Sequence, residues 1–430
     1  MSTLPPSAPD LEQTGGARRR GGLSVIITWL VTRAIIVLLA FTVENVATGD
    51  VHYYWRKIDV LLDVGLGQTL NEYPTPVVWI LSIPYGLGVG TRLGYLIVFI
   101  IFMLALDALF SVLLWRSCGG RRDAALNFWL FFIFLVGPLA YLRFDLLPAV
   151  LAGISLLVSR RQPWLTGVLT GVGAAIKLWP ALLIMPFLSY RKGRRATLIG
   201  FLAAGLGLAV ISLILGGLSR LFSPLTWQSD RGLQIESIWA SWPMLLRLFQ
   251  PKTWVVATSS YQAFEVFGPG VTVWLTISTV ATAIGVIAML ALYIRAFGNP
   301  EPTTAAIGLV IMATITLLIV TNKTLSPQYL VWLGGPMAAL LLMRSRRPDG
   351  KPTMISRFAI QLLVLAFLTH LVYPLTYHGL YDDRYPNLLI VSTILLVIRN
   401  LGLLIFAVAI TMAAWRATGR RPEAGTAETI

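Results

Sequence analysis

The sequence has few charged residues, a single cysteine and only three histidines. Charged residues make up 12% of the 430 residues and apolar residues 56%; a soluble domain carries about 25% charge, which it needs to cover its surface. The lone Cys118 excludes an internal disulfide framework and a cysteine-based zinc site. The scattered His52, His370 and His378 form no recognisable metal-binding motif. The composition therefore predicts an integral membrane protein with no metal or other cofactor.

The positive charge lies in short clusters between apolar runs. A net charge of +15 would suit a nucleic-acid-binding protein, but such a protein gathers its basic residues on one surface. Membrane proteins instead place basic clusters in the loops that stay in the cytoplasm. The distribution therefore predicts a lipid bilayer and no nucleic acid as partner. The clusters are 116–122, 159–161, 190–195, 344–351 and 416–421.

The apolar runs predict an all-α, polytopic transmembrane bundle of about 10–12 spans. The first run, 23–43, is long enough to cross a bilayer and longer than a cleavable signal core. Residues 1–22 are predicted to be a disordered cytoplasmic tail, 23–415 a single membrane domain and 416–430 a second cytoplasmic tail. The other complete runs are 93–116, 124–140, 146–160, 196–217, 269–296, 303–321, 326–343, 355–374 and 387–414.

Two apolar segments fit the charge pattern only if they do not cross. All basic clusters are cytoplasmic if 76–90 is incomplete and 163–190 enters the membrane and returns. The second segment is then a hairpin of two half-length helices with Lys177 and Pro180 at its tip. Broken helices are tolerated at membrane depth where they line a cavity. We therefore expect a cavity beside this tip.

This topology puts the polar segments together on the non-cytoplasmic side. They are the loops 44–75 and 218–268, the short segments 322–325 and 375–386, and the turn Arg143–Asp145. Asp50 follows the first span directly, where an ionised carboxylate can act as a general base on a hydroxyl. The alternative is an interfacial belt of Tyr and Trp with one solvated Asp. Arg143 and Asp145 are equally well explained as a turn with a local ion pair.

Four charges lie deep inside apolar runs, and one of them, Arg399 in the run 387–414, has no obvious partner. Lys177 costs about 2.5–3.5 kcal/mol to insert, so it needs a partner or an anion, and phosphate is suitable. A snorkelling or structurally paired lysine is the alternative. Arg33 and Asp107 lie at about the same depth in their spans, which predicts a buried ion pair between them.

Several short motifs together resemble the GT-C polyprenyl-phosphate-sugar glycosyltransferases, in particular the bacterial cell-envelope α-mannosyltransferases of glycosyltransferase family 87. The likeness covers residues 20–400. The motifs, in chain order, are Asp50-Val51-His52-Tyr53-Tyr54, Tyr73-Pro74-Thr75-Pro76, Arg143-Phe144-Asp145, the hairpin Gly167…Gly171…Gly173…Lys177-Leu178-Trp179-Pro180, Arg231-Gly232-Leu233-Gln234-Ile235-Glu236-Ser237 and Ser326-Pro327-Gln328-Tyr329-Leu330.

The resemblance implies an inverting transfer from a lipid-linked sugar donor, most simply polyprenyl-phosphate mannose, to a glycan or glycolipid on the periplasmic face of a bacterial plasma membrane. The general base of the family maps onto Asp50, and Arg143 and Lys177 map onto the donor phosphate. His378 is the positional match for a second catalytic-loop histidine, with Lys323 as its competitor. The remaining motif residues are expected to bind substrate; they are His52, Tyr53, Tyr54, Tyr73, Asp145, Arg231, Gln234, Glu236 and Gln328.

Three alternatives remain open at this point. A polyprenyl-phosphate arabinofuranose donor would suit the same architecture. A transporter or flippase is a different class of function, although transporters often show two related halves, which this sequence lacks. A non-catalytic scaffold would not need reactive side chains concentrated on one face.

Overall fold

The computed structural model describes residues 11–120, 123–261, 263–343, 353–382 and 384–419. Seven of its helices contain a stretch long and apolar enough to cross a membrane. This confirms an all-α, polytopic membrane protein. The helices that contain these stretches are α1 (Leu11–Phe41), α5 (Arg92–Ser117), α10 (Arg194–Ser229), α12 (Val271–Gly298), α13 (Thr304–Thr321), α15 (Met354–His370) together with η7 (Leu371–Leu375), and α17 (Pro386–Ala417).

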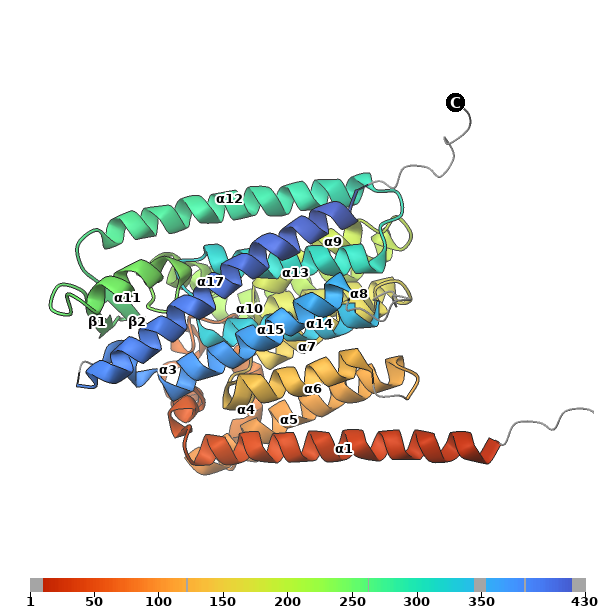
Figure 1. Cartoon of the computed structure of the whole chain (residues 1–430), viewed down its shortest axis with the longest axis horizontal. Helices are drawn as coiled ribbons and strands as arrows, with labels where there is room; N and C mark the ends of the chain where they lie inside the picture. Colours follow the sequence, from red (N-terminus) through yellow and green to blue (C-terminus); the bar gives the residue numbers. More distant parts are fainter. Residues whose placement is uncertain (1–10, 121–122, 262, 344–352, 383, 420–430) are drawn as a thin grey trace, which may run out of the picture.

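The long helices run between two faces of the molecule (Figure 1). At one face α5, α12 and α17 end and α10 begins, each with an arginine in the terminal turn, so we call it the basic face. The basic cluster at 344–351 lies outside the described residues, as do residues 1–10 and 420–430 of the predicted tails. Helix α1 already begins at Leu11, inside the segment predicted to be a tail.

The opposite face, which we call the loop face, carries the outer segments. It holds short helices and a hairpin that the sequence did not predict, in which β1 pairs antiparallel with β2, Val255 opposite Phe267. Helix α10 also continues to Ser229 after a break at Gly217 (φ 74°), so residues 218–229 are helical. The elements are η1 (Asn45–Thr48), α2 (Gly49–Asp59), α3 (Leu61–Val64), η2 (Leu66–Gln68), η5 (Ile238–Ala240), α11 (Ser241–Arg247), β1 (Val255–Thr258), β2 (Phe264–Phe267) and α16 (His378–Tyr381).

Shorter helices fill the interior of the bundle. Each of α6, α7 and α14 has 12 or 13 residues, about 20 Å at 1.5 Å per residue, whereas the hydrocarbon core is about 30 Å thick. The interior thus has room for a cavity at one end of these helices. The short elements are α4 (Thr75–Leu87), α6 (Ala124–Val136), η3 (Gly137–Ala140), α7 (Leu146–Val158), α8 (Pro163–Ile176), η4 (Trp179–Leu183), α9 (Ile184–Leu188), η6 (Pro327–Leu330), α14 (Val331–Leu342) and η7 (Leu371–Leu375).

The two incomplete segments have the predicted form. Helix α4 has 13 residues, too few to cross. Helix α8 enters from the basic face, the chain turns at Lys177 in an extended conformation, and η4 and α9 return. Close packing of α8 on α10 holds the hairpin, since a Cβ on Gly167 would collide with the backbone of Thr197.

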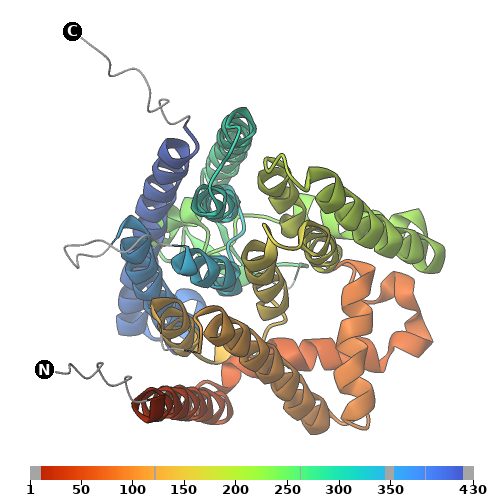
Figure 2. The same cartoon turned by 90° about the vertical axis from the view of Figure 1, so that its right-hand side faces the viewer.

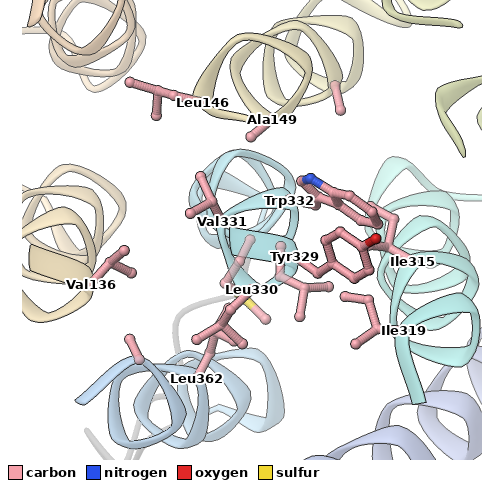
Figure 3. Close-up of a cluster of buried hydrophobic side chains, with 14 of the residues drawn as sticks. Val136, Leu146, Ala149, Ile315, Ile319, Tyr329, Leu330, Val331, Trp332 and Leu362 are labelled. Atoms are coloured by element: carbon pink, nitrogen blue, oxygen red, sulfur yellow. The ribbon is translucent and has the colours of Figure 1, made fainter. Parts of the chain in front are cut away.

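Helix α14 lies at the centre of the bundle and is buried on all sides. Figure 3 shows Leu330 and Val331 among side chains from α6, α7 and α15, and Trp332 and Tyr329 beside Ile315 of α13. A helix that is apolar all round is typical of a protein interior. Trp332 therefore has a fixed position, and its indole N–H points to a buried carboxylate described below.

The predicted ion pair between the first two complete spans is confirmed. Arg33 Nε and Nη2 donate to the carboxylate of Asp107 at 2.8 and 3.0 Å. Asp107 also accepts from Trp129 Nε1 at 2.7 Å and from the Tyr141 hydroxyl at 2.8 Å, and Arg33 Nη1 donates to the Leu130 carbonyl. The buried charges are thus compensated by a network rather than by a single contact.

Candidate active site

A cavity of about 680 Å³ opens at the loop face, beside the tip of the α8–η4–α9 hairpin. It is lined by residues from segments far apart in the sequence. Of the predicted site residues, nine line it: Asp50, Tyr53, Tyr73, Arg143, Lys177, Arg231, Gln234, Glu236 and Gln328. The convergence arises because the short helices α7 and α14 begin, and helix α8 of the hairpin ends, at this level.

Asp50 and Arg143 form an ion pair in the wall of the cavity. Asp50 lies in the first turn of α2 with its side chain 30% exposed, and the Arg143 guanidinium, 14% exposed, contacts its Oδ2. Burial raises the pKa of Asp50, and the charge of Arg143 counteracts this shift. A partly exposed carboxylate with a raised pKa is a better proton acceptor than a fully solvated one.

Lys177 and Asp145 form a second ion pair, so the alternative of a local Arg143–Asp145 pair is wrong. Lys177 Nζ lies 2.5 Å from Asp145 Oδ1, which also accepts from Trp332 Nε1 at 2.5 Å. Asp145 is buried, whereas Lys177 reaches the cavity. Both cations assigned to the donor phosphate therefore already have a carboxylate partner.

Aromatic rings surround the Lys177 ammonium group. Its Nζ lies 5.0 to 6.0 Å from four ring centroids, those of Phe144, Trp332, Tyr329 and Tyr73. Cation–π attraction at such distances favours a positive charge in a poorly solvated site. This cage could not be predicted from the sequence, since its rings come from segments spread over more than 250 residues of the chain.

Glu236 forms a third carboxylate site in the cavity. It is fully buried, and Arg399 of α17 donates to its Oε2 at 3.3 Å, so Arg399, which had no partner in the sequence analysis, pairs here. Burial raises the pKa of Glu236 to about 7, against the lowering effect of Arg399. Asn400 donates to the Glu236 carbonyl at 3.3 Å and so helps to hold this segment against α17.

Several polar atoms in the cavity wall have no hydrogen-bond partner among the described residues. Buried polar atoms of a folded protein are nearly always paired, so a local concentration of unpaired ones requires an explanation. A polar ligand that enters the cavity would supply their partners. The atoms are Arg143 Nε, Trp179 Nε1, Arg231 Nε, Glu236 Oε1 and Gln328 Oε1.

The remaining predicted site residues lie outside the cavity lining. Tyr54 is fully buried and packs on Phe144 and Tyr73. His52 of α2 accepts a hydrogen bond from Arg92, the first residue of α5. Lys323 and His378, the two candidates for the second catalytic position, are not among the lining residues. Their catalytic role stays a prediction that this geometry does not support.

A smaller apolar groove of about 250 Å³ adjoins the cavity. It lies between α4, α8 and α10, and it shares Pro74 and Leu178 with the cavity lining. Most of its other residues are apolar, among them Phe201 and Leu206. Helix α10, whose span is only 11% buried, forms its outer wall. A hydrocarbon chain could therefore lie in the groove while its polar end reaches the cavity.

Among the described residues, no group of three or more His, Cys, Asp or Glu could hold a metal ion. A comparison with curated proteins found no match. The family model of glycosyltransferase family 87 matches residues 73–321, more than half of the chain. The matched region contains Arg143, Lys177 and Glu236, and Asp50 lies before it. The chain therefore belongs to glycosyltransferase family 87, and the protein is a multi-pass membrane glycosyltransferase.

Proposed function

We propose that the protein transfers mannose from a polyprenyl-phosphate donor to a glycan or glycolipid, with inversion, at the non-cytoplasmic face of a bacterial plasma membrane. The observation that carries this proposal is the junction of the cavity with the apolar groove at Pro74 and Leu178. A donor made of a lipid tail, a phosphate and a sugar needs an apolar channel that leads to cationic and hydroxyl-binding groups. Lys177 lies one residue from the shared Leu178.

The reaction can be assigned to groups in the cavity. Asp50 takes the proton from an acceptor hydroxyl, whose oxygen attacks the anomeric carbon of the donor sugar. The bond from that carbon to the phosphate oxygen breaks, and polyprenyl phosphate leaves with the electron pair. Arg143 and Lys177 stabilise the negative charge that develops on the phosphate. Phosphate is already a good leaving group, so the proposed reaction needs no metal or other cofactor.

The two ion pairs constrain how the donor binds. Arg143 and Lys177 are paired with Asp50 and Asp145, so the phosphate meets two cations that each already have a carboxylate partner. Asp50 is more exposed than Asp145, and it is the partner more easily displaced. Displacement from Arg143 would free Asp50 to meet the acceptor hydroxyl, so that donor binding prepares the base.

The test is a transfer assay with purified protein in lipid nanodiscs. Radiolabelled polyprenyl-phosphate mannose, polyprenyl-phosphate arabinofuranose and GDP-mannose are supplied in parallel, with a glycolipid extract of the source membranes as acceptor. Label should enter the extract from the mannose lipid only, and not in the Asp50→Asn variant. Transfer only from the arabinose lipid would show that the transferred sugar is arabinofuranose and not mannose, and the proposed mechanism would stand. Transfer only from GDP-mannose would refute the lipid-linked donor.

A further inference from the structure

A continuous row of four aromatic rings forms one wall of the cavity. Tyr373 of η7 lies 4.9 Å from Tyr377, which lies 6.0 Å from Phe264 of β2. Phe264 stacks face to face on Tyr381 at 4.3 Å with 7° between the planes. All four line the cavity. We call these four residues the aromatic wall.

The aromatic wall begins at the reacting groups and leads away from the lipid groove. Tyr373 lies near enough to Arg143 and Asp50 for their charges to act on its hydroxyl, while Phe264 and Tyr381 belong to outer segments. The wall lies against α15 and α17, whereas the groove lies between α4, α8 and α10. Figure 2 shows α10 and the blue helices α15 and α17 on opposite sides of the bundle. The donor tail and the wall thus approach the site from different sides.

An unpartnered carboxylate oxygen accompanies the wall. Glu236 is fully buried, and Arg399 binds its Oε2, but its Oε1 has no hydrogen-bond partner among the described residues. Glu236 lines the same cavity, and the Tyr377 hydroxyl lies near enough to lower the pKa of Glu236, although no hydrogen bond from a described residue satisfies Oε1. A buried acceptor atom without a donor costs about 1–3 kcal/mol. A ligand that supplies an O–H would remove this cost.

The combination selects a particular class of ligand. A pyranose ring has an apolar face of C–H groups, which suits an aromatic ring, and a rim of hydroxyls, which suits a carboxylate. A phosphate group would instead be bound by the cations Lys177 and Arg143, which lie elsewhere in the cavity wall. The wall is therefore suited to a neutral sugar ring, and it is separate from the part of the cavity that suits the donor phosphate.

We propose that the aromatic wall and Glu236 form the acceptor subsite, in which a terminal sugar ring stacks beside Phe264 and Tyr381, donates a hydroxyl to Glu236 and presents another hydroxyl to Asp50. This inference rests on the proposed function. It makes the acceptor a glycan or glycolipid that ends in an uncharged sugar, and it makes Phe264 and Glu236 residues that determine acceptor binding.

The test separates acceptor binding from donor binding. In nanodiscs, the transfer rate from radiolabelled polyprenyl-phosphate mannose is measured while the glycolipid extract and the donor are varied in turn. The variants are Phe264→Ala, Phe264→Leu and Phe264→Tyr. The matched control is Trp242→Ala, since Trp242 is an aromatic residue of the same outer region, 54% exposed and not among the cavity-lining residues.

We expect Phe264→Ala and Phe264→Leu to raise the extract concentration for half-maximal rate about tenfold, with the donor KM within twofold of the wild type. Phe264→Tyr and Trp242→Ala should resemble the wild type. If Phe264→Leu needs the same extract concentration as the wild type, an apolar side chain of similar volume is sufficient. The proposed stacking of the sugar ring on Phe264 would then be wrong. If the donor KM rises as much as the extract concentration for half-maximal rate, the aromatic wall does not form a separate acceptor subsite. If Phe264→Ala does not fold, Phe264→Leu still decides.

These outcomes differ from a failure of the proposed function. If the wild type transfers no label from either polyprenyl-phosphate donor, the donor assignment is wrong. If the wild type is active and Phe264→Leu changes only the donor KM, the donor assignment stands and the acceptor subsite is wrong. Glu236→Gln gives an independent check, since an amide oxygen still accepts from a hydroxyl. It should keep more acceptor affinity than Glu236→Leu.

Discussion

Replacement of Asp50 by asparagine should lower catalysis and strengthen donor binding at the same time. The amide has the size of the carboxylate but cannot take a proton, so transfer should fall about 10²–10⁴-fold. The same change removes the negative charge that pairs with Arg143. Arg143 then becomes available to the donor phosphate without competition.

The change in donor affinity can be worked out from the exposed fractions of the two paired side chains. The side chains of Arg143 and Asp50 are 14% and 30% exposed. Exposed ion pairs contribute about 0.2–1 kcal/mol and hydrogen bonds to charged groups about 1.5–3 kcal/mol. About 1 kcal/mol is therefore reasonable for this pair. Since 1.4 kcal/mol corresponds to tenfold, the donor Kd of Asp50→Asn should fall about fivefold.

The assay combines equilibrium binding of the polyprenyl-phosphate donor with the transfer rate, in protein that is monodisperse and folded. A near-normal rate would remove Asp50 as the base, and Glu72, which accepts from Tyr53 at 2.8 Å in the same cavity, would be tested next. Donor binding that weakens in Asp50→Asn would refute competition for Arg143. Lys177→Ala, in contrast, should mainly weaken donor binding.

Three further predictions concern stability and topology. Asp107→Ala should cost about 3–5 kcal/mol of stability by thermal unfolding, and the double change with Arg33→Leu should recover only part of it, because the Trp129 and Tyr141 donors stay unpaired; full recovery would contradict the network. Glu236 binds more protons when folded than unfolded between about pH 4.5 and 7, so stability should fall as pH rises through this range; a Glu236→Gln variant with the same slope would contradict that shift. In a Cys118→Ser background, an impermeant thiol reagent should label a cysteine at 230 in intact cells but not one at 192.

Much of the fold could be predicted because the membrane imposes simple rules on the sequence. Span length and the position of basic clusters were enough to identify the hairpin at Lys177, which the structure has in the predicted form. The ion pair of Arg33 with Asp107 followed from equal depth and opposite sign, since unpaired charges in lipid are costly. These inferences need only distances along the chain.

The pairing of charges inside the cavity could not be predicted in this way. Asp50 and Arg143 were each assigned to the site, but their contact depends on how α2 packs beside the turn before α7. The same is true of Glu236 and Arg399, which are far apart in the chain. The aromatic wall was missed for a different reason. Tyr377 and Tyr381 lie in a short outer segment, where tyrosine is also expected as an interfacial anchor.

The paired charges also lower the free-energy cost of placing two cations in the cavity wall. An unpaired Lys177 or Arg143 would be costly in a poorly solvated cavity, and the carboxylates of Asp145 and Asp50 remove that cost. The two ion pairs differ in how easily they separate. Asp145 is buried and fixed by Trp332, while the four rings around Lys177 attract its charge from the other sides. In the proposed reaction, Lys177 would meet the donor phosphate without losing Asp145, whereas Arg143 would exchange Asp50 for it, and this exchange would link donor binding to the release of the base.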